Sequence, residues 1–282
     1  MFYFKKNIMN YNSISPHLRL PFSTVRGTYQ QRQQKALKCV EKLYKDLLPK
    51  FKRGKVRFEE VQTSVDNVLE NRVNLHVINH SISDEYGGQD VSISEFSGKL
   101  SALTLELEVP KKGFFRYVDL TTIIHEFQHV VDQLFHPKFL ARYQYMSTEG
   151  QYTSKYNRLY DDVLYVYEAP RGKKDRAKII KNIEYKIRKF LRRMPVEDKI
   201  NYIQDAKYFL ISEDNAYRTQ YKYAKRLDKK HIPVLAQDLE YQNKQFMFKE
   251  KIDLLTKLGF EIIQKERKKM ARMPKIKMYE EL

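Results

Sequence analysis

The sequence predicts an α+β fold in which a small sheet is followed by a mostly helical second half. Three observations support this prediction. Apolar and polar residues alternate strictly over residues 103–109, which is typical of a strand with one buried face. Apolar residues recur at helical spacing over residues 28–50, and again from residue 119 towards the end of the chain. Hydrophobic residues make up 42% of the 282 residues, enough for a buried core despite a formal net charge of +18.

The first half of the chain is expected to hold one helix and then the sheet. The helix should cover residues 28–50 and end near Pro49, because proline interrupts a helix interior. Short apolar runs at 56–61 and 73–77 indicate strands, and a pair of glycines at 87–88 indicates a turn. We therefore expect the sheet to occupy residues 55–110.

The second half is expected to be helical. The expected helices are 119–135, 153–168, 173–193, 197–229 and 235–270. Neither a repeat nor a low-complexity linker marks a domain boundary in the sequence. We expect a basic, partly ordered extension at 1–27, one domain at 28–230, and a helical segment at 231–282 packed on that domain.

Cysteine content and hydropathy limit the kinds of site and compartment. Cys39 is the only cysteine, so an intramolecular disulfide and a cysteine-rich metal site are excluded. Any metal must then be held by histidines and carboxylates, and a reducing, cytoplasmic-type compartment is favoured. No apolar run approaches the ~20 residues of a membrane-spanning helix, so we expect a soluble chain. Residues 1–40 carry seven Lys or Arg and no acid, a bias shared with organelle transit peptides, but a basic extension is the simpler interpretation.

The motif that points to chemistry is His125-Glu126-Phe127-Gln128-His129, which has the spacing HExxH. Residues four apart lie on one helical face one turn apart, so both imidazoles can bind one metal ion. Glu126 follows the first histidine, and its carboxylate can reach a water on that ion. One zinc ion suits the motif, because imidazole nitrogens are good zinc ligands and an open coordination position can hold water.

With this motif and the strand before it, the sequence resembles the zincin metallopeptidases over about residues 55–136. In that family the HExxH helix follows an edge strand that pairs with an extended peptide substrate. The resemblance implies a zincin-like fold, a small mixed sheet with an edge strand before the active-site helix. It also implies that His125 and His129 bind zinc, that Glu126 is the general base, and that the chain hydrolyses peptide bonds through a metal-activated water.

A catalytic zinc site needs a third protein ligand. The metzincin pattern HExxHxxGxxH is absent, because Asp132 stands at the glycine position. His136 comes one residue late and lies about 10 Å along a straight helix from His129, so it is better explained as a helix-end residue. Asp132 is better explained as a residue next to the metal site, or on the surface, than as a metal ligand.

The gluzincin subgroup of zincins takes its third ligand from a glutamate on a later helix, often in an E-x-x-A context. Glu213 precedes Ala216 by three residues in the middle of a long predicted helix, so Glu213 is the predicted third ligand. Glu149, twenty residues after His129, is the alternative. Further candidates are Asp161, Asp162 and Glu168. A donor to the substrate oxyanion could come from Tyr217 or Arg218.

Residues 171–230 are strongly basic, with 19 Lys or Arg against eight Asp or Glu, a net charge of +11. Tyrosines lie just upstream, and basic and aromatic residues together can bind nucleic acid or another acidic partner. The simpler interpretation is that these charges are the solvated faces of long helices. The alternative to a peptidase is therefore a non-catalytic basic binding or structural protein, acting on nucleic acid or in a large assembly, on a zincin scaffold.

Overall fold

The computed structural model describes residues 28–69, 76–81, 89–90, 96–97, 100–101, 104–109, 114–135 and 172–272. Contacts divide these residues into two compact units. The first holds the described residues up to 135 together with 212–242, and the second holds 172–211 together with 243–272. The extension expected at 1–27 and the helix expected at 153–168 lie outside the described residues. The domain boundaries expected from the sequence stay a prediction.

Helix α1 (Tyr29–Lys52) opens the first unit. It begins with a capping box, in which Thr28 Oγ1 accepts from the Gln31 backbone N–H and the Gln31 side chain accepts from the Thr28 N–H. The helix continues through Pro49, so the predicted end was three residues early. Phe51 in the added turn is fully buried, and this packing offsets the hydrogen bond that proline cannot make.

The strand predicted at 56–61 is wrong beyond its first two residues. Strand β1 (Val56–Arg57) is followed at once by helix α2 (Phe58–Leu69). The Glu60 carboxylate accepts from the Arg57 backbone N–H at 3.0 Å, and acidic residues favour a helix N-terminus. The buried side chains of α2 recur at helical spacing, namely Phe58, Val61, Val65, Val68 and Leu69. An apolar run this short fits the spacing of a strand as well as that of a helix. Because its buried side chains lie on one helical face, their burial favours the helix.

A three-stranded mixed sheet confirms the small mixed sheet expected from the sequence. Its order is β2 (His76–Ser81), β6 (Thr104–Val109) and β3 (Gln89–Asp90), with β2 parallel and β3 antiparallel to β6. The alternating strand was expected at the edge of the sheet, and this is wrong, because β6 is central and β3 is the outer strand beside it. Alternation reports that one face of a strand is buried, and it carries no information on how many neighbours the strand has.

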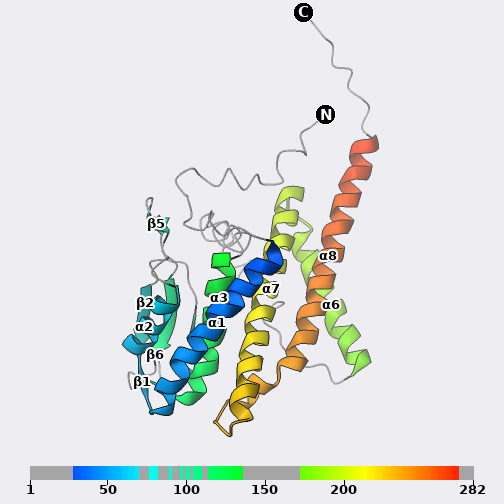
Figure 1. The fold of residues 1–282 in the computed structure, drawn as a ribbon. Coiled ribbons are helices and arrows are strands. Elements are labelled where there is room, and N and C mark those ends of the chain that lie inside the picture. Colours follow the sequence, from blue (N-terminus) through cyan, green and yellow to red (C-terminus); the bar gives the residue numbers. More distant parts are fainter. Residues whose placement is uncertain are drawn as a thin grey trace, which may run out of the picture. The chain divides into compact units, whose positions relative to one another are not determined.

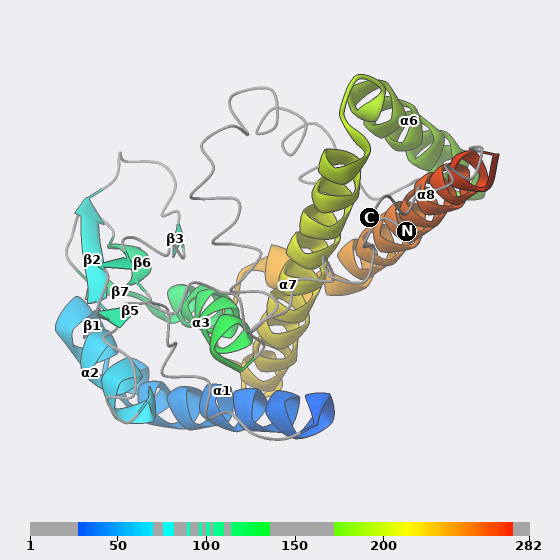
Figure 2. The same cartoon turned by 90° about the horizontal axis from the view of Figure 1, so that it is seen from above.

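Two shorter strand pairs complete the described sheet structure. Strand β1 pairs antiparallel with β7 (Phe114–Phe115), and β4 (Phe96–Ser97) pairs with β5 (Leu100–Ser101). Helix α3 (Leu120–Phe135) follows β7 after a short 3-10 turn, and it lies beside α1 and beside strands β3 and β6 (Figure 1; Figure 2). Its start agrees with the helix predicted at 119–135.

The core of the first unit joins α1, α2, α3 and the C-terminal part of helix α7 (Val196–Asp228). The rings of Tyr44 and Tyr223 lie 4.5 Å apart, and the Tyr223 hydroxyl donates to Glu41 at 2.8 Å. Arg226 also donates to Glu41, at 2.6 Å. These contacts hold the C-terminal part of α7 to α1, so the residues of α7 from Ser212 onward are placed in the first unit.

The second unit holds α6 (Lys173–Leu191), the N-terminal part of α7, and most of α8 (Tyr241–Arg272). In α6, Ile183, Ile187 and Leu191 are buried, and α6 lies beside α8 (Figure 1). Arg188 joins these two helices by donating to Glu261 at 2.7 Å. The helices predicted at 173–193 and 197–229 are confirmed, and the one predicted at 235–270 begins later, after a 3-10 turn (Ala236–Leu239).

The described part of the chain is thus mostly helical with small sheets, which is the α+β class expected. Among its helices, none combines the length and the apolar character needed to cross a membrane.

Candidate metal centre

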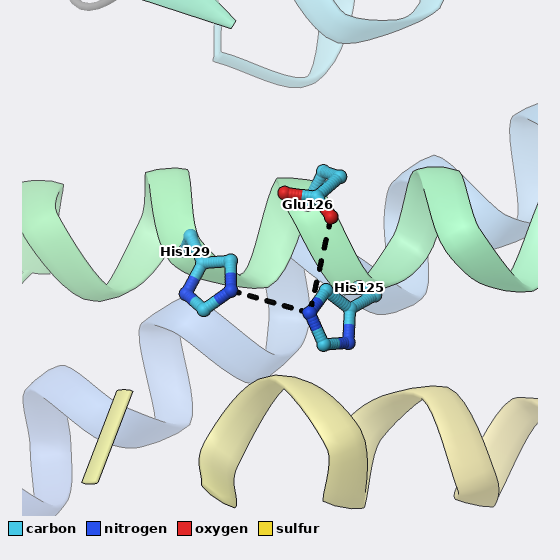
Figure 3. A group of neighbouring side chains, drawn as sticks. All are labelled: His125, Glu126 and His129. Atoms are coloured by element: carbon cyan, nitrogen blue, oxygen red, sulfur yellow. Dashed lines mark hydrogen bonds and ion pairs between the residues drawn. The ribbon is translucent and has the colours of Figure 1, made fainter. Parts of the chain in front are cut away.

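Helix α3 presents His125, Glu126 and His129 as one group. Their possible ligand atoms all lie within 4.8 Å of one another, so the group could hold a metal ion. The Nε2 atoms of the two histidines face each other at 3.3 Å, and Glu126 Oε1 lies 3.8 Å from His125 Nε2 (Figure 3). The three side chains are largely enclosed, with His125 and Glu126 buried and His129 partly buried.

Helix α7 adds a second carboxylate from a distant part of the sequence. Glu213 Oε1 lies 3.4 Å from His129 Nε2, and Glu213 Oε2 lies 3.8 Å from His125 Nε2. Ala216, one turn later, is fully buried, as expected for a small residue where two helices approach. The structure therefore brings together the two histidines and the glutamate that the sequence singled out.

The spacing of these atoms fits the donor set of one zinc ion. Nitrogen and oxygen ligands lie about 2.0–2.2 Å from zinc, so two ligands of a tetrahedral ion lie roughly 3.3–3.5 Å apart. Two of the distances lie in this range, namely 3.3 Å between the two Nε2 atoms and 3.4 Å between His129 Nε2 and Glu213 Oε1. The distance from His125 Nε2 to the other carboxylate oxygen, Glu213 Oε2, is longer at 3.8 Å. Two imidazoles and one carboxylate also match the ligands of a catalytic zinc site, which leaves a fourth position open.

The protonation of the histidines suits metal binding. His125 Nδ1 lies 3.0 Å from Gln220 Oε1, which can only accept, so Nδ1 carries the hydrogen and Nε2 keeps its lone pair. His129 Nδ1 lies 2.8 Å from the Ser212 hydroxyl. Burial lowers the pKa of His129 to about 4, so this imidazole is neutral at pH 7.

A second set of buried polar contacts joins α3 to α7 next to the histidines. Asp132 accepts from Gln128 Nε2 at 2.8 Å and from Asn215 Nδ2 at 3.1 Å. The Thr219 hydroxyl donates to Gln128 Oε1 at 2.9 Å. Burial raises the pKa of Asp132 to about 7, although both hydrogen bonds favour its charged form. Asp132 therefore belongs to the contact between the two helices, beside the metal group.

The two candidate oxyanion donors differ in position. The Tyr217 ring meets the His125 ring edge-on, with centroids 4.5 Å apart. Arg218 is exposed and donates to Asp214 at 2.5 Å. Tyr217 is thus the candidate that lies beside the histidines. The other acids and the histidine considered from the sequence lie outside the described residues, namely His136, Glu149, Asp161, Asp162 and Glu168.

Sequence reasoning missed three residues that contact the histidines or their neighbours. Gln220 follows Glu213 by seven residues on the same helical face, so helical spacing could have found it. Ser212 directly precedes Glu213, and consecutive helical residues do not face the same way, so spacing gives no signal for it. Asp238 accepts from Gln220 Nε2 at 2.9 Å, but it lies in the 3-10 turn beyond α7. No periodic pattern connects Asp238 to the site.

Comparison with known proteins gives no relative from which to transfer a function. No protein-family model matches the chain, and neither a curated protein nor a solved structure matches it. The case for a function therefore depends on the geometry of the site.

Proposed function

We propose that this chain is a zinc metallopeptidase of the zincin type, gluzincin-like in its third ligand, with one zinc ion bound by His125, His129 and Glu213. The observation that carries this proposal is the approach of Glu213 to both Nε2 atoms, at 3.4 and 3.8 Å. Glu213 is partly buried beside the two histidines, and a shared cation would balance its negative charge.

Each residue of the site then has a chemical role. A bound zinc ion would lower the pKa of a coordinated water and polarise a substrate carbonyl. Glu126 is not needed as a ligand, and its carboxylate is buried beside His125, so it serves as the general base and returns the proton to the leaving amine. Tyr217, whose ring contacts His125, is the proposed donor to the developing oxyanion.

A peptide substrate is favoured by the sheet next to the site. Among the described strands β3 is the outer one beside β6, and α3 lies against both. An outer strand can pair with an extended peptide through backbone hydrogen bonds, which brings a scissile carbonyl near the helix beside that strand.

Two substitutions separate the ligand role from the base role. Glu126→Gln should retain zinc and lose peptide hydrolysis, because only the proton acceptor is removed. Glu213→Gln should lose zinc affinity by more than the ~10–100-fold typical of changes outside the ligands themselves. Zinc content and affinity, measured by competition with a chromophoric chelator, and cleavage of an unfolded protein substrate provide the two readouts.

Asp214→Asn is the matched control for Glu213→Gln, because it removes a neighbouring carboxylate that pairs with Arg218. It should keep both zinc and activity. Absence of zinc from the purified wild type would contradict the proposal, and so would peptidase activity that survives in Glu126→Gln. Zinc binding without any cleavage would indicate an inactive zincin scaffold.

A second candidate function, binding of single-stranded nucleic acid, is favoured by the exposed face of α6. Residues spaced by four, three, four and four lie on this face, and all are exposed: Lys174, Lys178, Lys181, Tyr185 and Lys189. Tyr185 is 63% exposed. Within the described part of the chain none of these four lysines forms an ion pair, whereas Arg188 is held by Glu184 and Glu261. Free lysines can bind phosphates, and an exposed tyrosine can stack on a base.

Binding of a fluorescent single-stranded oligonucleotide tests this second function. Replacing Lys174, Lys178 and Lys181 with Gln should weaken binding. It should also reduce the slope of the logarithm of the binding constant against the logarithm of the salt concentration by about two. Replacing Lys265, Arg267 and Lys268 of α8 with Gln removes the same charge elsewhere and should have a smaller effect. Equal losses in the two triple variants would show that net charge, and no particular face, attracts the oligonucleotide.

A further inference from the structure

A continuous line of buried hydrogen bonds leads away from His125. Gln220 Oε1 lies 3.0 Å from His125 Nδ1, and Gln220 Nε2 donates to Asp238 Oδ1 at 2.9 Å. The Thr121 hydroxyl donates to the other carboxylate oxygen of Asp238 at 2.6 Å. All four side chains are buried, so bulk water does not compete for these bonds.

The direction of these bonds follows from the Asp238 carboxylate. An ionised carboxylate only accepts, so it holds the NH₂ end of the Gln220 amide and turns the carbonyl end towards His125. That carbonyl also only accepts, so the hydrogen of the neutral imidazole is kept on Nδ1. The Nε2 lone pair is then directed towards His129 Nε2 and Glu213, where the proposed metal would lie.

His129 has a different kind of neighbour. The Ser212 hydroxyl near its Nδ1 can donate or accept, so it does not select a tautomer. Of the two Nδ1 contacts, only the one at His125 therefore selects a tautomer.

We infer that Gln220 and Asp238 are positioning residues that set the tautomer and orientation of His125 for metal binding. This inference rests on the proposed function, since it concerns the same metal group. Outer partners of metal-binding histidines commonly orient the ring and raise its basicity. Here a carboxylate acts on the imidazole through an intervening amide.

Metal affinity tests the positioning role directly. Gln220→Leu removes the acceptor at similar size and should lower zinc affinity by roughly 10–100-fold, measured by chelator competition. The double variant Gln220→Glu with Asp238→Asn keeps the charge and reverses only the bond between these two residues. His125 Nδ1 still donates to residue 220 and the Thr121 hydroxyl still donates to residue 238, so the double variant should restore affinity. Thr219→Val is the matched control, because it breaks a buried bond between α3 and α7 that does not reach either histidine.

Nitrogen-15 NMR of the metal-free protein gives a readout independent of zinc. Wild-type His125 should carry its hydrogen on Nδ1, whereas in Gln220→Leu it should shift towards the Nε2 form. A wild-type hydrogen on Nε2 would overturn the inference, and so would equal zinc affinities of wild type and Gln220→Leu. A loss in Thr219→Val as large as in Gln220→Leu would attribute the effect to packing and also overturn it. Failure of the wild type to bind zinc would instead contradict the proposed function.

Discussion

His129 and Asp132 lie close together on α3, and burial shifts their pKa values in opposite senses. The pKa of the His129 imidazole falls from 6.5 to about 4, and that of the Asp132 carboxyl rises from 3.8 to about 7. Between pH 4 and 6.5 the His129 imidazole is protonated in the unfolded chain but neutral in the folded protein. This residue therefore makes the free energy of unfolding rise with pH over that range. Asp132 acts oppositely, because the folded protein retains a proton that the unfolded chain loses, so stability falls from about pH 4 to 7.

Asp132→Asn should remove the contribution of Asp132 to the pH dependence of stability and leave that of His129. An amide keeps the shape of a protonated carboxyl and cannot ionise, so the variant should gain stability relative to the wild type as pH rises from 4 to 7. The gain should be at most ~1.4 kcal/mol per pH unit. Denaturant unfolding of both metal-free proteins at several pH values measures the difference. A difference that does not change with pH would show that Asp132 is already ionised when folded.

At the scale of elements, the site depends on how closely α7 approaches α3. Side chains from successive turns of α7 contact α3, namely Ser212, Asn215, Thr219 and Gln220. Ala216 lies among them on the same helical face and is fully buried. A small side chain at this position lets Glu213 come within 3.4 Å of His129.

Ala216→Leu should therefore weaken metal binding as well as stability. The larger side chain overpacks the contact, at a cost of about 1–3 kcal/mol, and moves Glu213 away from the histidines. Ala224→Leu is the control, because Ala224 is equally buried but lies about 12 Å further along α7. Thermal unfolding and zinc affinity measure the two effects. Unchanged zinc affinity in Ala216→Leu would show that the helix spacing tolerates a larger residue.

At the scale of the whole molecule, the proposed metal joins segments that are distant in sequence but belong to one unit. His125 and His129 lie on α3, and Glu213 lies on the part of α7 assigned to the same unit. A ligand that binds only the folded state adds stability, about 4 kcal/mol at a thousand times its dissociation constant. The second unit contributes none of these three residues.

Removing metal with a chelator should therefore loosen the first unit selectively. Hydrogen–deuterium exchange should increase in residues 120–135 and 212–228, and change little in α6 and in residues 249–272. Mass spectrometry of peptides from both units, with and without chelator, makes the comparison, and re-addition of zinc is the control. Equal increases in both units would mean that the metal stabilises the chain as a whole.

Several elements and most of the metal group could be predicted from the sequence because they depend on local spacing. HExxH places His125 and His129 on one face of any helix. Glu213 was predicted from the resemblance to gluzincins, in which the third ligand often stands in an E-x-x-A context. Helix α2 was missed because a short apolar run fits a strand as well as a helix. The place of β6 was missed because strand order depends on pairing with segments elsewhere in the chain.

The sequence by itself thus determined the α+β class, the long helices of the second half and the pair of histidines one turn apart. Only the tertiary structure decided that Glu213 lies against those histidines, and that Gln220 and Asp238 line up behind His125. The physical reason is that spacing along one helix fixes directions within that helix alone. Contacts between α3, α7 and the turn after α7 depend on how their buried faces pack.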